Sequence, residues 1–393
     1  MKRRLPVRSA DLRGAVRLAA EATAGLTDLV EAMHERIARL PGVPASGEAG
    51  RTRGITGLVY KSIRGVTRLV GGSVDALLGL LTPALSTADS SREREAVVAA
   101  LNGVLGDHLA ASANPLAIGM AFRSAGTALP LDDRSALAAA LPAANGRVLV
   151  LLHGLCMNDL QWTRDGHDHG AALARDLGFT PVYLHYNSGL PIGANGRELA
   201  GLLEQLLANW PLPVERLVLL GHSMGGLVAR SALHHGALAG CRWPARVDDV
   251  VFLGTPHHGA PLERAGHGVD VLLEATPYAA PFARLGKLRS AGITDLRHGC
   301  VVEGQPRQAV PLPSRPRCHA IAANTGPQGG SVKARLIGDG LVPVASALGR
   351  HKDAARQLAF APERQAVVYG CNHMALLSHA EVYALLREAL ARP

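Results

Sequence analysis

Apolar positions along the chain recur with two different periods. Up to about residue 125 they repeat at the three- and four-residue spacing of helices, and no strand pattern is recognisable. From about residue 146 onward, short apolar runs alternate with amphipathic segments of helical period. Such alternation favours a mostly parallel sheet flanked by helices. The sequence therefore predicts an all-helical N-terminal extension, residues 1–125, and an α/β domain, residues 146–393.

Three helices are predicted in the N-terminal extension. The first, residues 9–40, has an apolar seam at heptad spacing and ends at Pro41-Gly42. The second, residues 55–81, has an apolar stripe that several glycines interrupt, and the third covers residues 91–109.

The basic face of the second helix leaves two interpretations open. Lys61, Arg64 and Arg68 lie opposite the apolar stripe, and a basic amphipathic helix can lie on an anionic membrane. Residues 51–85 are therefore a candidate peripheral membrane contact. The favoured alternative is that the stripe packs on the first helix or on the α/β domain.

The α/β domain is predicted to contain a succession of strands and helices. The strands are residues 148–152, 180–186, 216–220, 250–253, 318–322 and 365–369. The helices are residues 171–177, 198–210, 227–233 and 380–390. A stretch from His257 to about Arg317 interrupts the alternation and carries helical patterns at residues 269–273 and 282–288.

A glycine-rich turn stands between the third of these strands and its helix. Its sequence, Gly221-His-Ser-Met-Gly-Gly226, has the G-x-S-x-G pattern of a nucleophile elbow. The serine of such an elbow sits on a sharp, strained turn, where side chains at Gly221 and Gly225 would collide with the neighbouring strand and helix. Ser223 is therefore the candidate catalytic nucleophile.

A serine hydroxyl needs a base to take its proton and an acid to orient that base. On this fold the order along the chain is serine, acid, histidine. His373 follows the last predicted strand and is the expected base; His379, at a helix start, is the weaker candidate. Asp339, between two glycines, is the expected acid, although an Asp-Gly surface turn or a calcium ligand would have the same sequence.

The oxyanion of a tetrahedral intermediate needs hydrogen-bond donors. The usual pair is the backbone N–H after the nucleophile and one from the loop after an early strand. These positions are Met224 and Leu155, the latter in Leu152-His-Gly-Leu155.

Composition excludes several function classes. The chain has 393 residues, a formal net charge of +9 and a pI of about 9.7, but aromatic residues make up only 4% and no nucleic-acid-binding motif is present. A nucleic-acid partner is therefore not expected. The sequence contains no run of about 18 apolar residues free of charge, so no membrane span is predicted.

The five cysteines are scattered and lack C-x-x-C spacing, so neither a disulfide framework nor a zinc site is predicted, and a reducing compartment is favoured. His167-Asp-His169 has the residue types of a zinc site, but consecutive positions do not converge easily on one ion. The expectation is a cytoplasmic protein without metal or cofactor, with attachment to a membrane surface as the open alternative.

From about Gly146 to its end the chain resembles the α/β-hydrolase superfamily, and within it bacterial lipases and the hydrolase domain of GPI inositol-deacylase. The matching features are His153-Gly154, the elbow, Gly254-Thr-Pro-His-His-Gly259, Asp339-Gly-Leu-Val342 and Asn372-His373. This resemblance implies cleavage of a carboxylic ester or lipid by a triad of Ser223, Asp339 and His373 without a cofactor. It also implies a lid inserted at about residues 257–317.

Two further functions remain open. An acyltransferase or thioesterase would use the same triad and differ only in what accepts the acyl group. A non-catalytic, membrane-associated binding protein on a hydrolase scaffold is the alternative from another class, and the full set of candidate triad residues argues against it. The sequence predicts neither the oligomeric state nor the acyl chain length of a substrate.

Overall fold

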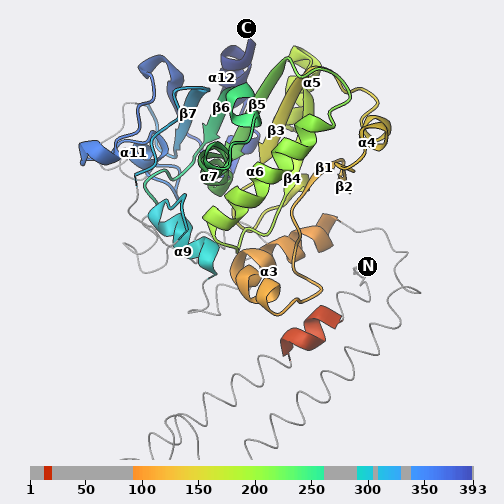
Figure 1. Ribbon diagram of the computed structural model, residues 1–393. Helices are drawn as coiled ribbons and strands as arrows, with labels where there is room; N and C mark the ends of the chain where they lie inside the picture. The colour runs from red at the N-terminus through yellow and green to blue at the C-terminus, as the bar shows by residue number, and fades with distance from the viewer. Residues whose placement is uncertain (1–12, 20–91, 261–289, 304–308, 329–337, 392–393) are drawn as a thin grey trace, which may run out of the picture. The chain divides into compact units, whose positions relative to one another are not determined.

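The computed structural model describes residues 13–19, 92–260, 290–303, 309–328 and 338–391 (Figure 1). The described residues fall into two compact units. The first contains residues 13–19, 92–94 and 109–117, and the second contains residues 95–108 and everything from residue 118 onward.

Few residues of the first unit are among those described. Residues 13–19 are helical. The side-chain amide of Asn114 donates a hydrogen bond to the carbonyl oxygen of Gly14 at 3.1 Å, and Arg17 donates one to the carbonyl oxygen of Ala113 at 3.2 Å.

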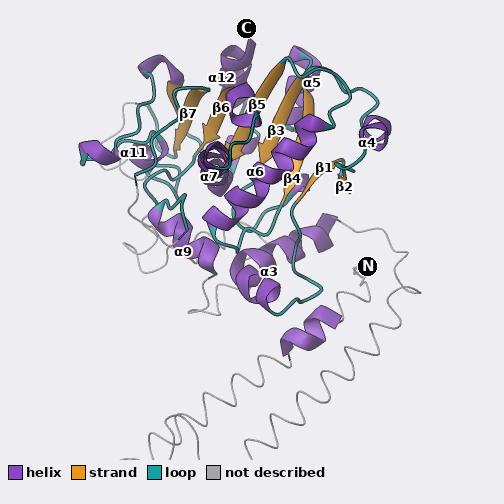
Figure 2. Ribbon diagram, viewed as in Figure 1, coloured by secondary structure: helices purple, strands orange, loops and turns teal. Residues whose placement is uncertain are grey.

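The second unit is built on an eight-stranded sheet in the order β2-β1-β4-β3-β5-β6-β7-β8 (Figure 2). Strand β1 is antiparallel to β2 and β4, and all the other neighbours are parallel. From β4 to β8 this strand order is that of the α/β-hydrolase fold, so the predicted fold class is confirmed. The strands are β1 (Ala121–Ser124), β2 (Thr127–Ala128), β3 (Arg147–Leu152), β4 (Thr180–His185), β5 (Arg216–His222), β6 (Val247–Leu253), β7 (Arg317–Asn324) and β8 (Gln365–Tyr369).

Helices connect the strands and cover both faces of the sheet (Figure 2). The α-helices are α3 (Arg92–Ala111), α4 (Arg134–Ala140), α5 (His169–Leu177), α6 (Ile192–Ala208), α7 (Met224–Leu238), α9 (Ala291–His298), α11 (Val344–Ala347) and α12 (Ala380–Ala391). Short 3₁₀ helices are η1 (Asp159–Trp162), η2 (Trp243–Arg246), η4 (Ala354–Arg356), η5 (Pro362–Arg364) and η6 (Ala375–Leu377).

The core lies on the two faces of the sheet. Side chains of a strand alternate between faces, so Val148 and Val150 of β3 pack in one cluster with α6 and α7. Leu149 and Leu151 pack in the other cluster with α5 and α12. Because both faces are covered, a central strand such as β3 is apolar at nearly every position, which makes it recognisable in the sequence.

All the predicted strands of the α/β domain are confirmed, and so are the helices that correspond to α3, α5 and α12. The predicted start of α6 at residue 198 is wrong, because the helix begins at Ile192. Gly193 and Gly196, in the first turns of α6, disfavour a helix in the sequence, so the beginning of α6 was not predicted. Gly196 is needed for close packing, since a Cβ there would lie 2.1 Å from the hydroxyl oxygen of Ser231 on α7.

Two further expectations need correction. The helix predicted at residues 227–233 is longer, since α7 spans Met224–Leu238 and continues past Gly236. The N-terminal region up to residue 125 is not free of strands, since β1 spans Ala121–Ser124 at the antiparallel side of the sheet. Short strands of this kind carry too few apolar positions to be recognised.

Several expectations fall outside the described residues. These are most of the first helix, the whole of the second with its membrane contact at residues 51–85, and the helical patterns at residues 269–273 and 282–288. The described part of the expected lid contains α9. In the described segments, no helix combines the length and apolar character that a bilayer span requires.

A buried ion network ties together the first residues of three neighbouring strands. Asp249 of β6 is fully buried, and it accepts hydrogen bonds from Arg216 of β5 at 2.9 Å and from Arg317 and His319 of β7 at 2.9 and 3.0 Å. Burial opposes ionisation of this carboxyl, but the hydrogen bonds from His319, Arg317 and Arg216 outweigh it and lower its pKa from 3.8 to about 2.

We expect Asp249→Asn to lower the free energy of unfolding by about 3 kcal/mol near neutral pH, because it leaves Arg216 buried without its counter-charge. Folding lowers the pKa of Asp249, so its stabilising effect is present above about pH 4 and is lost as the pH falls toward 2. Urea unfolding of both proteins should therefore show a stability difference that shrinks over this range. Asp132→Asn, at an exposed position, is the control and should change little; a difference independent of pH would contradict the assignment.

Candidate active site

Ser223 joins strand β5 to helix α7 in a backbone conformation that few residues other than glycine adopt. Its φ and ψ are 53° and −122°. Its N–H donates to the carbonyl oxygen of Leu253 on β6 at 2.8 Å, and its carbonyl oxygen accepts from the N–H of Gly226 at 3.1 Å. Such strain persists only where surrounding structure holds it, and it is typical of functional residues.

The glycines around Ser223 permit a close approach of backbones. A Cβ at Gly221 would lie 2.6 Å from the Cα of Gly226. A Cβ at Gly225 would lie 2.2 Å from the carbonyl oxygen of Leu152, at the end of β3. The elbow therefore rests directly on two neighbouring segments, as its sequence predicted.

Asp339 and His373 meet through their side chains. The Nδ1 atom of His373 lies 2.6 Å from an Oδ atom of Asp339, and the His373 N–H donates to the Asp339 carbonyl oxygen at 3.0 Å. The other carboxylate oxygen of Asp339 accepts from the N–H groups of Leu341 and Val342 at 2.9 and 2.7 Å. Both side chains are buried, so the contact is shielded from water.

This pair lies beside the elbow because β5 to β8 are parallel neighbours. Ser223 follows β5, Asp339 lies beyond β7, and His373 follows β8, so all three come from the same edge of the sheet. Gly254, just after β6, lies against Asp339 and His373, since a Cβ there would lie 3.1 Å from Asp339 Oδ2 and 3.2 Å from His373 Nδ1.

Two neutral imidazoles that sequence analysis did not single out for their chemistry stand next to the residues of the elbow and of the loop after β3. His222 places Nε2 3.1 Å from the His373 carbonyl oxygen, and their rings lie 4.7 Å apart. Burial, reinforced by the neighbouring His373, lowers the pKa of His222 well below its ordinary value. Burial also lowers the pKa of His153, whose Nδ1 faces the Gly154 carbonyl oxygen, to about 3. Neither ring brings a positive charge to the site at neutral pH.

Leu155 and Met224 are both buried. Met224 is the first residue of α7, and Leu155 lies in the loop after β3. That loop passes directly beside the elbow, since a Cβ at Gly154 would lie 3.2 Å from the Cβ of Ser223.

The weaker candidates occupy structural positions. His379 accepts a hydrogen bond from the N–H of Glu381 in the first turn of α12. Asp168 accepts from the N–H of Ala171 at the start of α5, and its neighbours His167 and His169 contact each other at 2.8 Å. Among the described residues, no three histidine, cysteine or carboxylate side chains gather as a metal site would require.

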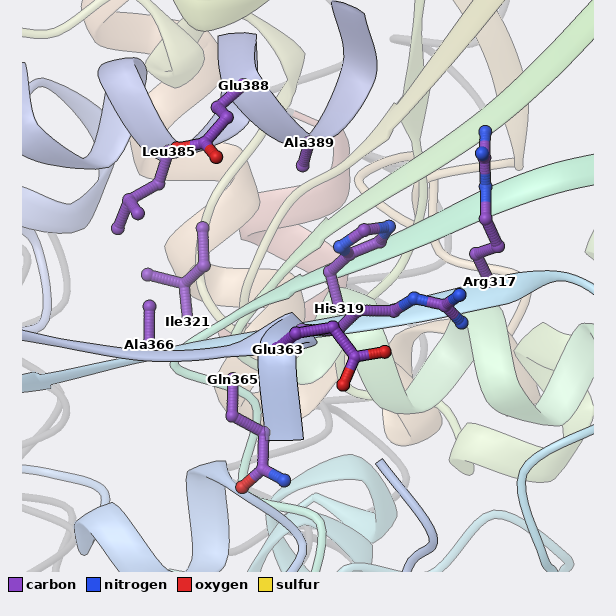
Figure 3. Close-up of a pocket in the computed structure, with 10 residues that line it drawn as sticks. Arg317, His319, Ile321, Glu363, Gln365, Ala366, Leu385, Glu388 and Ala389 are labelled. Atoms are coloured by element: carbon purple, nitrogen blue, oxygen red, sulfur yellow. The ribbon is translucent and has the colours of Figure 1, made fainter. Parts of the chain in front are cut away.

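A hollow of about 230 Å³ lies away from this group, between the starts of β7 and β8 and helix α12 (Figure 3). Arg317, His319 and Glu388 are among its lining side chains. Arg317 and His319 are committed to the buried Asp249. The hollow therefore opens at the opposite ends of the strands from Ser223.

A family model, the PGAP1-like alpha/beta domain, matches residues 193–304, which include the elbow. The chain resembles the PGAP1-like α/β-hydrolase domains. No curated protein matches the chain.

Solved structures of α/β hydrolases also resemble it. The Bacillus licheniformis lipase BlEst2 is 20% identical, with a TM-score of 0.43 over 62% of this chain and 91% of the lipase. The Pyrococcus furiosus esterase Pf2001 is 14% identical, with a TM-score of 0.39 over 64% of this chain and 83% of the esterase.

We expect Gly225→Ala to destabilise the protein by about 3 kcal/mol or more, because the added methyl group meets the rigid end of β3. Gly201→Ala is the matched control, since Gly201 lies on the exposed face of α6 with open space around its Cα. There alanine should stabilise the helix by up to about 1 kcal/mol. Thermal unfolding of both variants checks this, and equal behaviour would contradict the close approach at Gly225.

Proposed function

We propose that this chain is a serine hydrolase that cleaves carboxylic esters through an acyl-enzyme. The observation that carries the proposal is the 2.6 Å contact between His373 Nδ1 and Asp339, beside a serine held at positive φ. A base oriented by a buried acid, next to a strained serine, is the arrangement that nucleophilic catalysis by serine requires.

In the proposed reaction, the Ser223 oxygen attacks the ester carbonyl while Nε2 of His373 takes the hydroxyl proton. Because Nδ1 faces Asp339, Nε2 is the ring nitrogen available for this transfer. Asp339 fixes the tautomer and stabilises the imidazolium that forms. The imidazolium then gives its proton to the departing alcohol, and a water molecule, deprotonated by His373, hydrolyses the acyl-enzyme.

We assign the stabilisation of the negative charge on the tetrahedral intermediate to the backbone N–H groups of Met224 and Leu155. Met224 begins α7, whose N-terminal end favours negative charge. The loss of one such donor costs about 10²- to 10³-fold in kcat in other hydrolases.

The substrate class is proposed to be an ester or a lipid, in keeping with the esterases and lipases that the fold resembles. An acyltransferase or thioesterase with the same triad differs in the group that accepts the acyl chain. Turnover of p-nitrophenyl esters of graded chain length, with and without added alcohol or thiol acceptors, separates these activities.

We expect a fluorophosphonate probe to label the wild-type protein and not Ser223→Ala, because the probe forms a bond with the activated serine oxygen. Asp339→Asn should keep the fold but lower kcat by about 10⁴-fold, since the amide favours the wrong tautomer of His373. Ser135→Ala, at an exposed position of α4, is the control and should label normally. A wild-type protein that is not labelled, or a Ser223→Ala variant that is, would refute the proposal.

A further inference from the structure

The loop after β3 contains a non-glycine residue in the left-handed region. Cys156 has a φ of 59° and is buried. A side chain makes this conformation unfavourable, so it persists only where neighbouring groups hold it. Cys156 directly follows Leu155, the proposed second donor to the oxyanion.

One neighbour that holds this turn is Ser188. Its hydroxyl oxygen accepts a hydrogen bond from the N–H of Cys156 at 3.0 Å, and its side chain is buried in the loop after β4. The adjacent Asn187 fixes that loop in turn, because its side chain accepts from the N–H of Gly189 and donates to the carbonyl oxygen of Gly106 on α3.

Helix α3 packs closely against the same turn. A Cβ at Gly103 would lie 2.2 Å from the Sγ of Cys156 and 2.9 Å from its Cα. Ser290 donates a hydrogen bond to the carbonyl oxygen of Gly103 at 2.7 Å, which holds this part of α3 in place. Burial raises the pKa of the Cys156 thiol to about 12, so the thiol stays neutral and packs as an apolar group.

Leu155 therefore lies between two fixed points. On one side, Gly154 rests against Ser223 and His222. On the other, the N–H of Cys156 is tied to Ser188. Fixing the chain on both sides of Leu155 fixes the direction of the N–H between them, and donors of this kind act only when they are preorganised.

We propose that Ser188 is a positioning residue of the oxyanion site, acting through Cys156 on the N–H of Leu155, with Gly103 of α3 as the surface against which the turn is set. This inference rests on the proposed function. It assigns a role in that reaction to a serine that does not touch the reacting atoms.

The test compares Ser188→Ala with Ser231→Ala in turnover of a p-nitrophenyl ester. Ser231 is also buried and also makes a hydrogen bond to backbone, donating to the Val301 carbonyl oxygen, but it lies away from the loop after β3. We expect Ser188→Ala to lower kcat by about 10-fold or more, with KM nearly unchanged. This decrease is smaller than the decrease in kcat of about 10²- to 10³-fold that follows the loss of a whole oxyanion donor. Ser231→Ala should leave kcat unchanged at a similar loss of thermal stability, and Ser188→Thr, which keeps the hydroxyl, should restore most of kcat.

Wild-type turnover and fluorophosphonate labelling are measured first, so that an inactive protein refutes the proposed function and is not counted against Ser188. With an active wild type, an unchanged kcat in Ser188→Ala overturns the inference. An equal fall of kcat in Ser188→Ala and Ser231→Ala also overturns it, since the effect would then follow stability alone. If Ser188→Ala does not fold, Ser188→Cys, with its weaker acceptor, decides in the same way: a lowered kcat at unchanged KM supports positioning, and a wild-type kcat overturns it.

Discussion

The contact on which the site depends is the approach of the elbow backbone to the end of β3. Gly225 lies so near the Leu152 and His153 carbonyl oxygens that a Cβ could not be accommodated. This approach sets the first turn of α7 against the loop after β3, which brings the backbone of Met224 and the loop containing Leu155 to the same serine. It also holds Ser223 at a positive φ, because the hydrogen bond from its N–H to Leu253 fastens the other side of the turn to β6. Strain in one residue is thus held by three strands and a helix.

A buried carboxylate lies at each end of the parallel strands, and the two carboxylates have different partners. At their starts, Asp249 is surrounded by two arginines and a histidine, and the network is closed. At their other ends, Asp339 has two backbone N–H donors and one imidazole as partners. This arrangement satisfies the carboxylate without committing it to a permanent cation, so its negative charge remains available to an imidazolium. His222 and His153 stay neutral because burial lowers their pKa values, so neither adds a second positive charge near the imidazolium.

The sequence predicted the parts of the fold in which local pattern and tertiary structure agree. Central strands such as β3 and β5 are apolar at nearly every position because both faces are buried, and the G-x-S-x-G turn has a steric cause that two glycines express directly. Prediction from the sequence failed where a residue is required by a contact with a distant segment of the chain. Gly196 favours the end of a helix in the sequence, but its lack of a side chain allows the close packing of Ser231. The residues next to Cys156 in the sequence do not predict its left-handed conformation, because the contacts that stabilise it come from Gly103 and Ser188. The same limit applies to Asp339 and His373, whose order along the chain was readable while their contact depends on the parallel packing of β7 and β8.

Part of the N-terminal helical region supports the loop after β3. Residues 95–108 of α3 belong to the unit that carries the elbow, although their helical pattern groups them with the N-terminal extension. Gly103 and Gly106 are not weak points of this helix. At Gly103 the side chain and backbone of Cys156 come closer than a Cβ would allow, and at Gly106 the side-chain amide of Asn187 does. Replacing these glycines by better helix formers would strengthen the isolated helix and displace the loops at once. The two glycines within α3 are therefore explained by its contact with the loops beside Ser223.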